Sequence, residues 1–441
     1  MSGESIALRA NRLWSHGNLL EDVTVAVEAG KISGVFGRAR GGERMGDVLP
    51  GSMAGKVGLE GLTREDGWTV LQMDEGVTLM PGMIDCHVHL VFPGDGSELH
   101  DALKPDDHTL LLRASDNAAR ALGAGVTTLV DAGAPGDIIF PLARGIESGV
   151  ARGARVIPAG APITITGGHC WPMGGQADTK EEVVTRVRAQ MRDGAQLIKV
   201  MGTGGGTPGT NSYVPVYPRE VLEAIVAEAR RLDRRTLIHS GATVATRAAV
   251  RAGFDVIFHA HFHRSDGSLV YDDSLVEEML SAGTWVNPTL WVNRVLGEVA
   301  EREARDGVRG AAERAETHKK RYDGQRENVA RMFEAGVRPL MGSDSGWGHA
   351  SFEDGLLREL QCASELGMSA ESLLDLVTDG AAGFLGRDDL GALKPGAVAD
   401  VVGVAGSPWR EIRDLEAVEF VMSGGAVYAA RFPSQTEGEV R

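Results

Sequence analysis

The feature of this sequence that most constrains its fold is a repeated alternation of short apolar runs and helical patterns after residue 80. Eight runs are predicted to be strands, at residues 82–87, 126–131, 154–159, 197–201, 236–239, 255–259, 284–288 and 338–343. Helical patterns lie between them, among others at residues 109–122, 180–193, 219–232 and 243–252. Eight alternating units favour an α/β fold of the (β/α)8 TIM-like barrel type over an open doubly wound sheet.

Both ends of the chain carry strand patterns of another kind. Alternating runs lie at residues 6–10, 23–27, 32–36 and 68–71, and again at residues 399–404, 420–422 and 426–428. We therefore expect one small β-sandwich domain built from residues 1–80 plus 393–441, beside a barrel of residues 81–392. Residues 38–66 are glycine-rich and charged, which predicts a surface loop inserted in the first domain. Residues 298–334 are charged and helical, and they are expected to cap or flank the barrel.

Composition and charge argue against several classes of partner. The formal net charge of -16 provides no basic face for a phosphate backbone. No apolar run is long enough to span a bilayer, and no signal peptide is visible. Cys86, Cys170 and Cys362 are too few and too scattered for a disulfide framework, which favours a cytoplasmic location. We expect a small-molecule substrate, no nucleic acid and no membrane as partners, and assembly as a homo-oligomer.

Potential metal ligands stand at the ends of five predicted strands. Alternate side chains of a strand share a face, so His87 and His89 can bind one divalent cation together. The other strand ends carry Lys199, His239 and His259, with Asp344 just past the eighth strand. Each residue alone has a structural alternative, as a snorkelling lysine, a core histidine or a helix cap. A barrel gathers its strand ends at one rim, so we expect these side chains to converge there.

The segments around these residues resemble the metal-dependent amidohydrolase superfamily. Its opening signature is similar to PGMIDCHVHL at residues 81–90, and its strand-eight aspartate to GSDS at residues 342–345. Its return to a β-sandwich is similar to LKPGAVADVV at residues 393–402. Within the superfamily, residues 166–169 and 197–201 resemble the branch of imidazolonepropionase-like enzymes and zinc-dependent Xaa-Pro and Xaa-Arg dipeptidases.

The resemblance implies a binuclear centre of two divalent metal ions, expected to be Zn²⁺. It implies that His87 and His89 bind the first ion and His239 and His259 the second. Lys199 is then an N6-carboxylysine that bridges the ions, because a neutral amine can add carbon dioxide to become an anionic carbamate. Asp344 is expected to bind metal, to take the proton of the bridging hydroxide or water as it attacks, and to pass that proton to the leaving nitrogen.

Two segments depart from the pattern of this branch. IHSG at residues 238–241 stands where the branch has HAHG, and FHAHFH at residues 258–263 stands where it has EHG. His259 keeps the expected register, and His261 or His263 competes for metal or contacts the substrate. We interpret these differences as an altered substrate range. The run GTGGGT at residues 202–207 is expected to be an active-site loop, since a dinucleotide-binding loop needs a helix directly after it.

The expected function is metal-dependent hydrolysis of the C–N bond of an N-acyl amino acid or dipeptide. One alternative is hydrolysis of a cyclic amide or an aromatic xenobiotic amide, and another is a non-catalytic metal-binding scaffold. His169 is expected to be catalytic with Asp344, as a donor that polarises the scissile carbonyl, or to have no role. The candidate substrate-binding residues are His169, Tyr213, Tyr217 and His261, although both tyrosines fit buried packing equally well.

Overall fold

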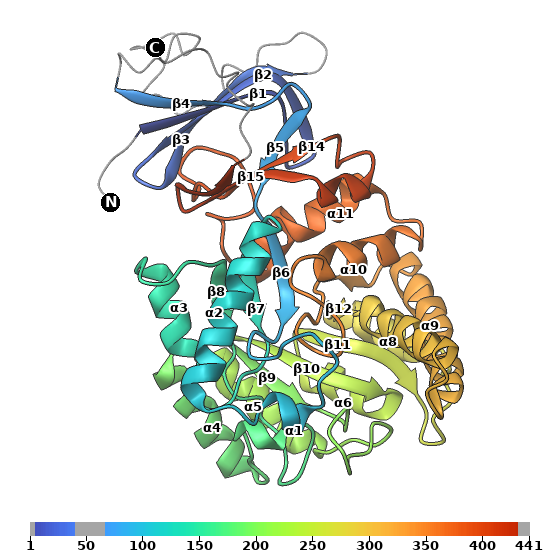
Figure 1. Cartoon of the computed structure of the whole chain (residues 1–441). Coiled ribbons are helices and arrows are strands. Elements are labelled where there is room, and N and C mark those ends of the chain that lie inside the picture. The colour runs from blue at the N-terminus through green and yellow to red at the C-terminus, as the bar shows by residue number, and fades with distance from the viewer. Residues whose placement is uncertain (1–4, 40–66, 431–441) are drawn as a thin grey trace. The chain divides into compact units, whose positions relative to one another are not determined.

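The computed structural model describes residues 5–39 and 67–430 (Figure 1). The chain divides into two compact units, Met1–Ile84 with Leu122–Thr127 and Met368–Arg441, and Asp85–Ala121 with Thr128–Gly367. The predicted insertion at residues 38–66 lies outside the described residues, except for Arg38 and Ala39, which belong to a strand. No helix in the described ranges is both long enough and apolar enough to cross a lipid bilayer.

The first unit contains a sheet made from both ends of the chain. Its strands are β1 (Ser5–Ser15), β2 (Asn18–Glu28), β3 (Lys31–Ala39), β4 (Trp68–Gln72), β5 (Val77–Pro81), β14 (Val401–Ala405), β15 (Val418–Ser423) and β16 (Ala426–Ala430). Hydrogen bonds connect them in the order β16-β15-β14-β5-β1-β2-β3, and β4 pairs with β1. Strands of the head and the tail thus form one β-domain, in a single sheet rather than two separately paired ones.

Apolar side chains explain why these distant strands meet. Leu8, Val25, Leu79, Val401 and Phe420 are almost fully buried and belong to one cluster. All residues of β5 and almost all of β14 are buried, so these strands lie inside the unit with both faces covered. Removing this apolar surface from water favours the pairing of the two chain ends. The same unit holds α11 (Ala370–Val377), α12 (Asp379–Leu385) and the short helix η4 (Ile412–Glu416).

The second unit is organised around two parallel sheets. One has the order β6-β7-β8 and the other the order β13-β12-β11-β10-β9. The strands are β6 (Met83–Val88), β7 (Val126–Asp131), β8 (Arg155–Pro158), β9 (Leu197–Met201), β10 (Arg235–Ala242), β11 (Val256–His263), β12 (Trp285–Asn287) and β13 (Arg338–Pro339). All eight predicted barrel strands are present, and Figure 1 shows β9 to β12 lying side by side.

Hydrogen bonds link the two parallel sheets at both of their edges. The main-chain N–H of Asp344, which follows β13, donates to the carbonyl of His87 on β6 over 2.7 Å. The N–H of Ile163, which follows β8, donates to the carbonyl of Lys199 on β9 over 2.9 Å. Each edge strand therefore has a neighbour from the other sheet, and both links lie next to residues predicted to bind metal.

Helices alternate with these strands as the sequence pattern predicts. They are α1 (Leu99–Ala102), α2 (Asp107–Gly123), α3 (Ile139–Glu147), η3 (Trp171–Met173), α4 (Lys180–Asp193), α5 (Arg219–Arg231), α6 (Thr243–Ala252), α7 (Asp273–Ala282), α8 (Leu290–Arg305), α9 (Ala311–Glu334) and α10 (Gly355–Ser364). A capping box of Thr179 and Glu182 begins α4. Gly253 ends α6 with φ of 89°, a left-handed conformation that glycine adopts without strain.

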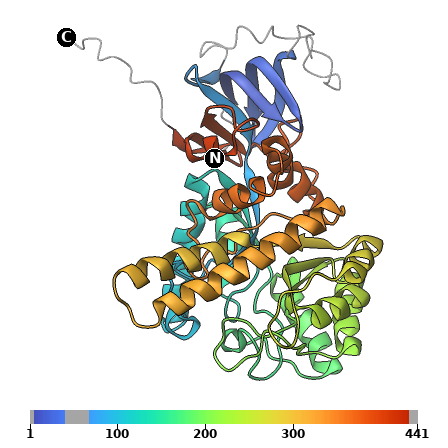
Figure 2. The same ribbon diagram turned by 90° about the vertical axis from the view of Figure 1, so that its right-hand side faces the viewer.

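The charged region at residues 298–334 forms parts of two helices. α8 ends at Arg305 and α9 begins at Ala311, with Gly307 and Gly310 at positive φ between them. The two helices pack side by side as a hairpin, which Figure 2 shows as the long orange pair.

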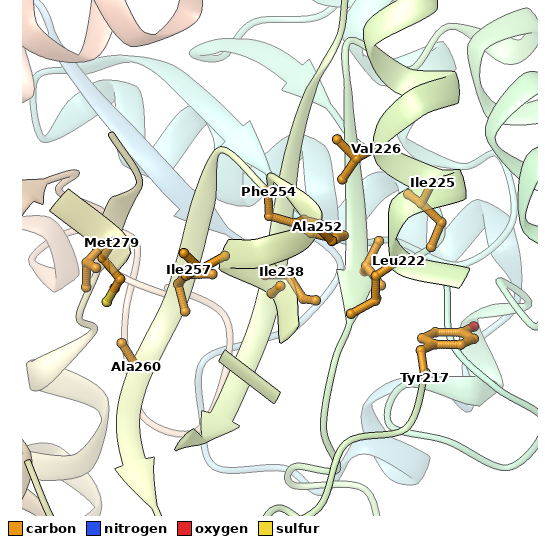
Figure 3. Packing of buried hydrophobic residues seen from close by; sticks show 14 of the residues in the cluster. Tyr217, Leu222, Ile225, Val226, Ile238, Ala252, Phe254, Ile257, Ala260 and Met279 are labelled. Carbon is orange, nitrogen blue, oxygen red and sulfur yellow. The ribbon is translucent and has the colours of Figure 1, made fainter. Parts of the chain in front are cut away.

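A large apolar cluster fixes the strands β9 to β12 against their helices. Figure 3 shows Leu222 of α5 beside Ile238 of β10, with Ile257 of β11 next to it. These side chains are fully buried or nearly so, which holds the strand ends in one register relative to each other. The polar residues at those ends are therefore carried on a rigid support.

A truncation in this cluster should destabilise the unit. Val187 on α4 is fully buried in the cluster, whereas Val150 is 87% exposed. We expect Val187→Ala to lower the free energy of unfolding by about 2 kcal/mol, from lost burial and the cavity left behind. Val150→Ala is the matched control and should change it by less than about 0.5 kcal/mol. Urea denaturation of both variants measures the difference, and equal midpoints would contradict the packing described here.

Candidate active site

Six side chains predicted from the strand ends line one cavity of about 430 Å³. They are His87 and His89 from β6 and the turn after it, Lys199 from β9, His239 from β10, His259 from β11 and Asp344 after β13. All of them belong to the second unit. The expected convergence of these six residues is thus present in the structure.

The closest group within this set is formed by two histidines and the aspartate. The Nε2 atoms of His87 and His89 each lie 3.3 Å from Oδ1 of Asp344. The ligand-type atoms of these three buried residues all lie within 4.8 Å of one another. The ring of His259 continues the row, with its centroid 5.6 Å from that of His87 and 4.5 Å from that of His239.

Hydrogen bonds fix which nitrogen of His87 carries the proton. Its Nδ1 lies 2.8 Å from Oδ1 of Asn287, whose own amide donates to the carbonyls of Leu340 and Gly342. With both amide hydrogens of Asn287 used, its oxygen must accept, so His87 donates from Nδ1. Nε2 therefore keeps a free lone pair that faces Asp344.

The other three histidines are held in the same manner. His89 donates from Nδ1 to the carbonyl of Gly133 over 3.1 Å, and His239 donates from Nε2 to the carbonyl of Gly204 over 3.0 Å. His259 donates from Nδ1 to the hydroxyl of Thr289 over 2.6 Å, since that hydroxyl itself donates to a carbonyl. Each ring therefore retains one free nitrogen, which is the form in which imidazole binds a metal.

This donor set fits a divalent cation. The Nε2 atom of His87 is buried and has no hydrogen-bond partner, which normally costs about 1–3 kcal/mol. Two imidazole lone pairs and a carboxylate oxygen facing one another repel unless a positive charge lies among them. Burial, and after it the charge of Lys199, lowers the pKa of His87 well below its usual value, so His87 itself does not supply that charge. His87, His89 and Asp344 are therefore suited to hold a metal ion.

Lys199 is a buried amine beside this group. Its Nζ lies 4.3 Å from the centroid of the Phe258 ring, and the side chain is 1% exposed. Burial lowers the pKa of Lys199 to about 8, against an opposing effect of the acidic groups Asp344, Cys170 and Asp131. A larger fraction of neutral amine than in an ordinary lysine is thus present near neutral pH.

The main chain is strained at three residues of the site. His259, Thr289 and Asp344 have φ values of 71°, 50° and 58°. Residues other than glycine rarely adopt such angles, at a cost of about 1–3 kcal/mol each. Strain concentrated in this way is typical of functional sites, where the surroundings enforce an orientation that the backbone does not prefer.

Buried carboxylates behind the cavity were missed by the sequence analysis. Asp85 accepts hydrogen bonds from the N–H groups of His87 and Ser343, and burial raises the pKa of Asp85 to about 6. Glu359 accepts from the N–H groups of Leu290 and Trp291, which begin α8 directly after Thr289. Asp85 had a sequence signal, two positions before His87 on the same strand face, whereas Glu359 had none.

The predicted carbonyl-polarising residue His169 lies in the cavity. Its Nδ1 is 2.8 Å from the hydroxyl of Thr207, which accepts a hydrogen bond from the N–H of Cys170. If the hydroxyl donates to Nδ1, Nε2 of His169 carries the proton. Burial lowers the pKa of His169 to about 3, so the ring is neutral. A Cβ added to Gly205 would lie 2.3 Å from Nε2 of His169, which explains a glycine in this loop at the cavity.

Of the other predicted substrate contacts, His261 lines the cavity, whereas Tyr213 and Tyr217 do not. His261 lines the cavity beside His259, as does His263. Tyr213 packs its ring against His263 but is not among the residues that line the cavity. Tyr217 is in the apolar core, where its hydroxyl donates to the carbonyl of Ala177 over 2.6 Å. The structure thus follows the packing alternative for Tyr217, because a hydroxyl satisfied there is not directed at the cavity.

Comparisons with known proteins agree with this site. The model of the amidohydrolase family matches residues 78–430. Ochratoxinase from Aspergillus niger is 28% identical over 386 residues, covering 79% of this chain and 75% of that protein. A prolidase complexed with N-methylphosphonate-L-proline is 26% identical with a TM-score of 0.76, covering 97% of this chain and 100% of that chain.

A third relative supports the fold alone. The crystal structure of a Xaa-Pro dipeptidase with bound methionine is 22% identical and has a TM-score of 0.77, covering 97% of this chain and 100% of that chain. The family match spans both ends of the parallel-sheet unit and every residue that lines the cavity. The chain therefore belongs to the amidohydrolase family, and it is an enzyme that hydrolyses amide bonds.

Proposed function

We propose that this enzyme is a binuclear metal-dependent hydrolase that cleaves the C–N bond of an N-acyl amino acid or a dipeptide. The observation that carries the proposal is the set of four histidines, each with one ring nitrogen hydrogen-bonded to an oxygen acceptor and the other free. Lys199 and Asp344 share their cavity. Such a set suits metal ions better than it suits packing, because free buried lone pairs are unfavourable on their own.

Two ions fit the number and type of donors. His87 and His89 would hold one ion and His239 and His259 the other, with Asp344 as a further ligand and Lys199 between them. Neutral imidazoles and carboxylates are common zinc ligands, so we propose zinc. Divalent ions bound there supply Lewis acidity, which lowers the pKa of water and polarises a carbonyl.

The bridge requires a chemical change at Lys199. The neutral amine attacks the carbon of carbon dioxide, an N–C bond forms, and one C–O bonding pair moves to oxygen. Loss of the amine proton to solvent leaves an anionic carbamate, an N6-carboxylysine. A pKa of about 8 supports this step, since it makes the neutral amine available near physiological pH.

Two residues would handle the proton and the carbonyl. Asp344 lies at the meeting point of the His87 and His89 nitrogens, where its carboxylate would accept a proton from the attacking water. The same carboxylate would then give that proton to the leaving nitrogen, which must be protonated before the C–N bond breaks. His169 would donate from Nε2 to the scissile carbonyl, as its contact with Thr207 allows.

Two relatives bear on the substrate class, and each favours a different candidate. The prolidase was solved with a proline whose nitrogen carries a phosphonate, a tetrahedral group that resembles the adduct formed when water adds to an amide carbonyl. Ochratoxinase favours the second candidate, a cyclic amide or an aromatic xenobiotic amide. The aromatic rings of Phe92 and Trp347, 5.7 Å apart at the cavity, suit either an apolar side chain or an aromatic acyl group.

The remaining features of the proposal concern the whole chain. We propose a closed (β/α)8 barrel of residues 81–392, which the hydrogen bonds at both sheet edges support. The β-sandwich domain would consist of residues 1–80 plus 393–441. Three free, buried cysteines are consistent with a cytoplasmic enzyme. Assembly as a homo-oligomer, and the lack of nucleic-acid and membrane partners, stay predictions.

A substrate screen tests the proposed function. We expect zinc-loaded enzyme to hydrolyse members of a panel of N-acyl amino acids and dipeptides, measured as release of free amino acid. Cyclic amides and aromatic amides without a carboxylate form the comparison panel. Activity confined to the comparison panel would replace the proposed substrate class with the second candidate.

The bridging role of Lys199 makes a separate prediction. Lys199→Ala should reduce the metal content from two ions towards one or none and abolish activity, because the anionic bridge is lost. Short-chain carboxylates such as propionate should restore part of both. Metal analysis and initial rates measure these effects, with exposed Lys180→Ala as the matched control. A fully metal-loaded enzyme whose Lys199 is a bare amine by crystallography would contradict the bridge.

The proposed role of Asp344 in proton transfer leads to another testable prediction. Asp344→Asn should retain the fold while kcat decreases by roughly 10²-fold or more, the usual effect of losing a general acid–base. Asp306→Asn, at an exposed position after α8, should leave kcat unchanged. Circular dichroism and steady-state kinetics check both variants. A kcat for Asp344→Asn close to that of the unaltered enzyme would assign the proton transfer to another residue, with His261 first in line.

A further inference from the structure

We propose that Arg321, on α9, is the residue that recognises the free carboxylate of the substrate. This inference rests on the proposed function and deepens it by naming the side chain that selects an N-acyl amino acid or peptide over a simple amide. It also adds a residue of α9 to the candidate substrate-binding residues indicated by the sequence, which were His169, Tyr213, Tyr217 and His261.

Arg321 lies on the wall of the cavity that α8 and α9 provide. It is half-buried and lines the same cavity as the six proposed metal-centre residues. His318 lies one turn earlier on α9 and also lines it, so both residues share one face of the helix. Asn293 of α8 lines the cavity beside them.

The guanidinium has no recorded partner in the described part of the chain. Four other cations of α9 are paired: Arg314 with Glu303, Lys319 with Asp323, Lys320 with Glu316 and Arg331 with Asp273. Arg326 has no printed ion pair either, but it is exposed to solvent, whereas Arg321 is half-buried at the cavity. A cation removed from water without a partner is costly, and an anionic ligand would offset that cost.

Among the charged residues of the cavity, Arg321 is the cation available to bind an anionic ligand. Among its described lining residues, Lys199 and Asp344 belong to the proposed metal centre, and Glu98 is acidic. Burial, and after it the charge of Arg321, lowers the pKa of His318, so this ring is neutral at physiological pH. The guanidinium is thus the positive charge of this wall, and its planar fork matches a carboxylate in a bidentate pair.

The position of Arg321 suits a carboxylate close to the scissile bond. A row of imidazoles leads from the metal centre along this wall, with centroids 5.7 Å apart for His259 and His261 and 5.4 Å apart for His261 and His263. Arg321, His261 and His263 line the same cavity, and Asn328, two turns after Arg321 on α9, donates to the carbonyl of His261 over 3.2 Å. In an N-acyl amino acid the carboxyl carbon is only three bonds from the scissile carbonyl carbon.

A substitution with two substrates tests this assignment. The substrates are N-benzoyl-L-phenylalanine and its C-terminal carboxamide, with benzoate release as the readout in zinc-loaded full-length enzyme. Arg321→Met should lower kcat/KM for the free acid by roughly 10²-fold or more, because the carboxylate loses its charged partner. The carboxamide should be cleaved as before, which also shows that the variant folds. Arg321→Lys should be intermediate, since it keeps the charge without the fork.

Arg326→Met is the matched control, as Arg326 is exposed on the same helix and does not line the cavity. An acid-to-amide ratio in Arg321→Met equal to that of the unaltered enzyme overturns the assignment while leaving the proposed function intact. If the unaltered enzyme cleaves neither compound, the proposed function fails for this class, and calorimetric binding of N-benzoyl-L-phenylalanine decides about Arg321. Binding lost in Arg321→Met and kept in Arg326→Met supports it, and equal binding in both overturns it.

Discussion

The structure depends on one electrostatic constraint: several lone pairs are directed at one another among buried side chains. The nitrogens of His87 and His89 face a carboxylate oxygen of Asp344 at 3.3 Å, an arrangement that is unfavourable without a cation. The fold maintains it by assigning the other nitrogen of each ring to a fixed acceptor. Asn287, Gly133, Gly204 and Thr289 provide these acceptors from four different segments. Their positions set the ring orientations, and through them the chemistry available at the centre.

Buried carboxylates extend this constraint into the surrounding fold. Asp85 joins the main chain of β6 to Ser343, next to Asp344. Glu359 accepts the first free N–H groups of α8 and thereby secures the turn at Thr289, the partner of His259. Both residues touch only main chain and a hydroxyl, so they act through the orientation of the ligands. The strained φ values of His259, Thr289 and Asp344 are maintained by such contacts.

The sequence predicted the strands for a physical reason, and the six candidate ligands that it indicated line one cavity. The barrel strands are short apolar runs between helices with clear periodicity, and all eight predicted runs correspond to observed strands. Ligands at strand ends follow from the geometry of parallel strands, so local sequence was enough to find His239 and Asp344. The break between α8 and α9 was marked by Gly307 and Gly310, although the charged pattern continued through it.

Residues whose roles depend on contacts between distant segments could not be identified from the local sequence. Tyr217 follows a strand in sequence, yet its hydroxyl is directed at Ala177 because α5 and its neighbours enclose the ring. Arg321 lies in a helix crowded with charges, and only its tertiary position separates it from exposed neighbours such as Arg326. Pairing between distant segments decides such roles, and a single sequence does not record it.

The hairpin of α8 and α9 links substrate specificity to the support of the proposed metal centre, two properties that are usually treated as separable. Gln325, one turn after Arg321, is fully buried and donates to the carbonyl of Pro288, next to the threonine that orients His259. If Arg321 binds the substrate as proposed, the same helix also supports the proposed metal centre. If substrate specificity changes during evolution by replacements on this helix, Gln325 must be kept while Arg321 varies. New specificities are then expected to arise by single replacements on α9, and not by exchange or rebuilding of the whole helix.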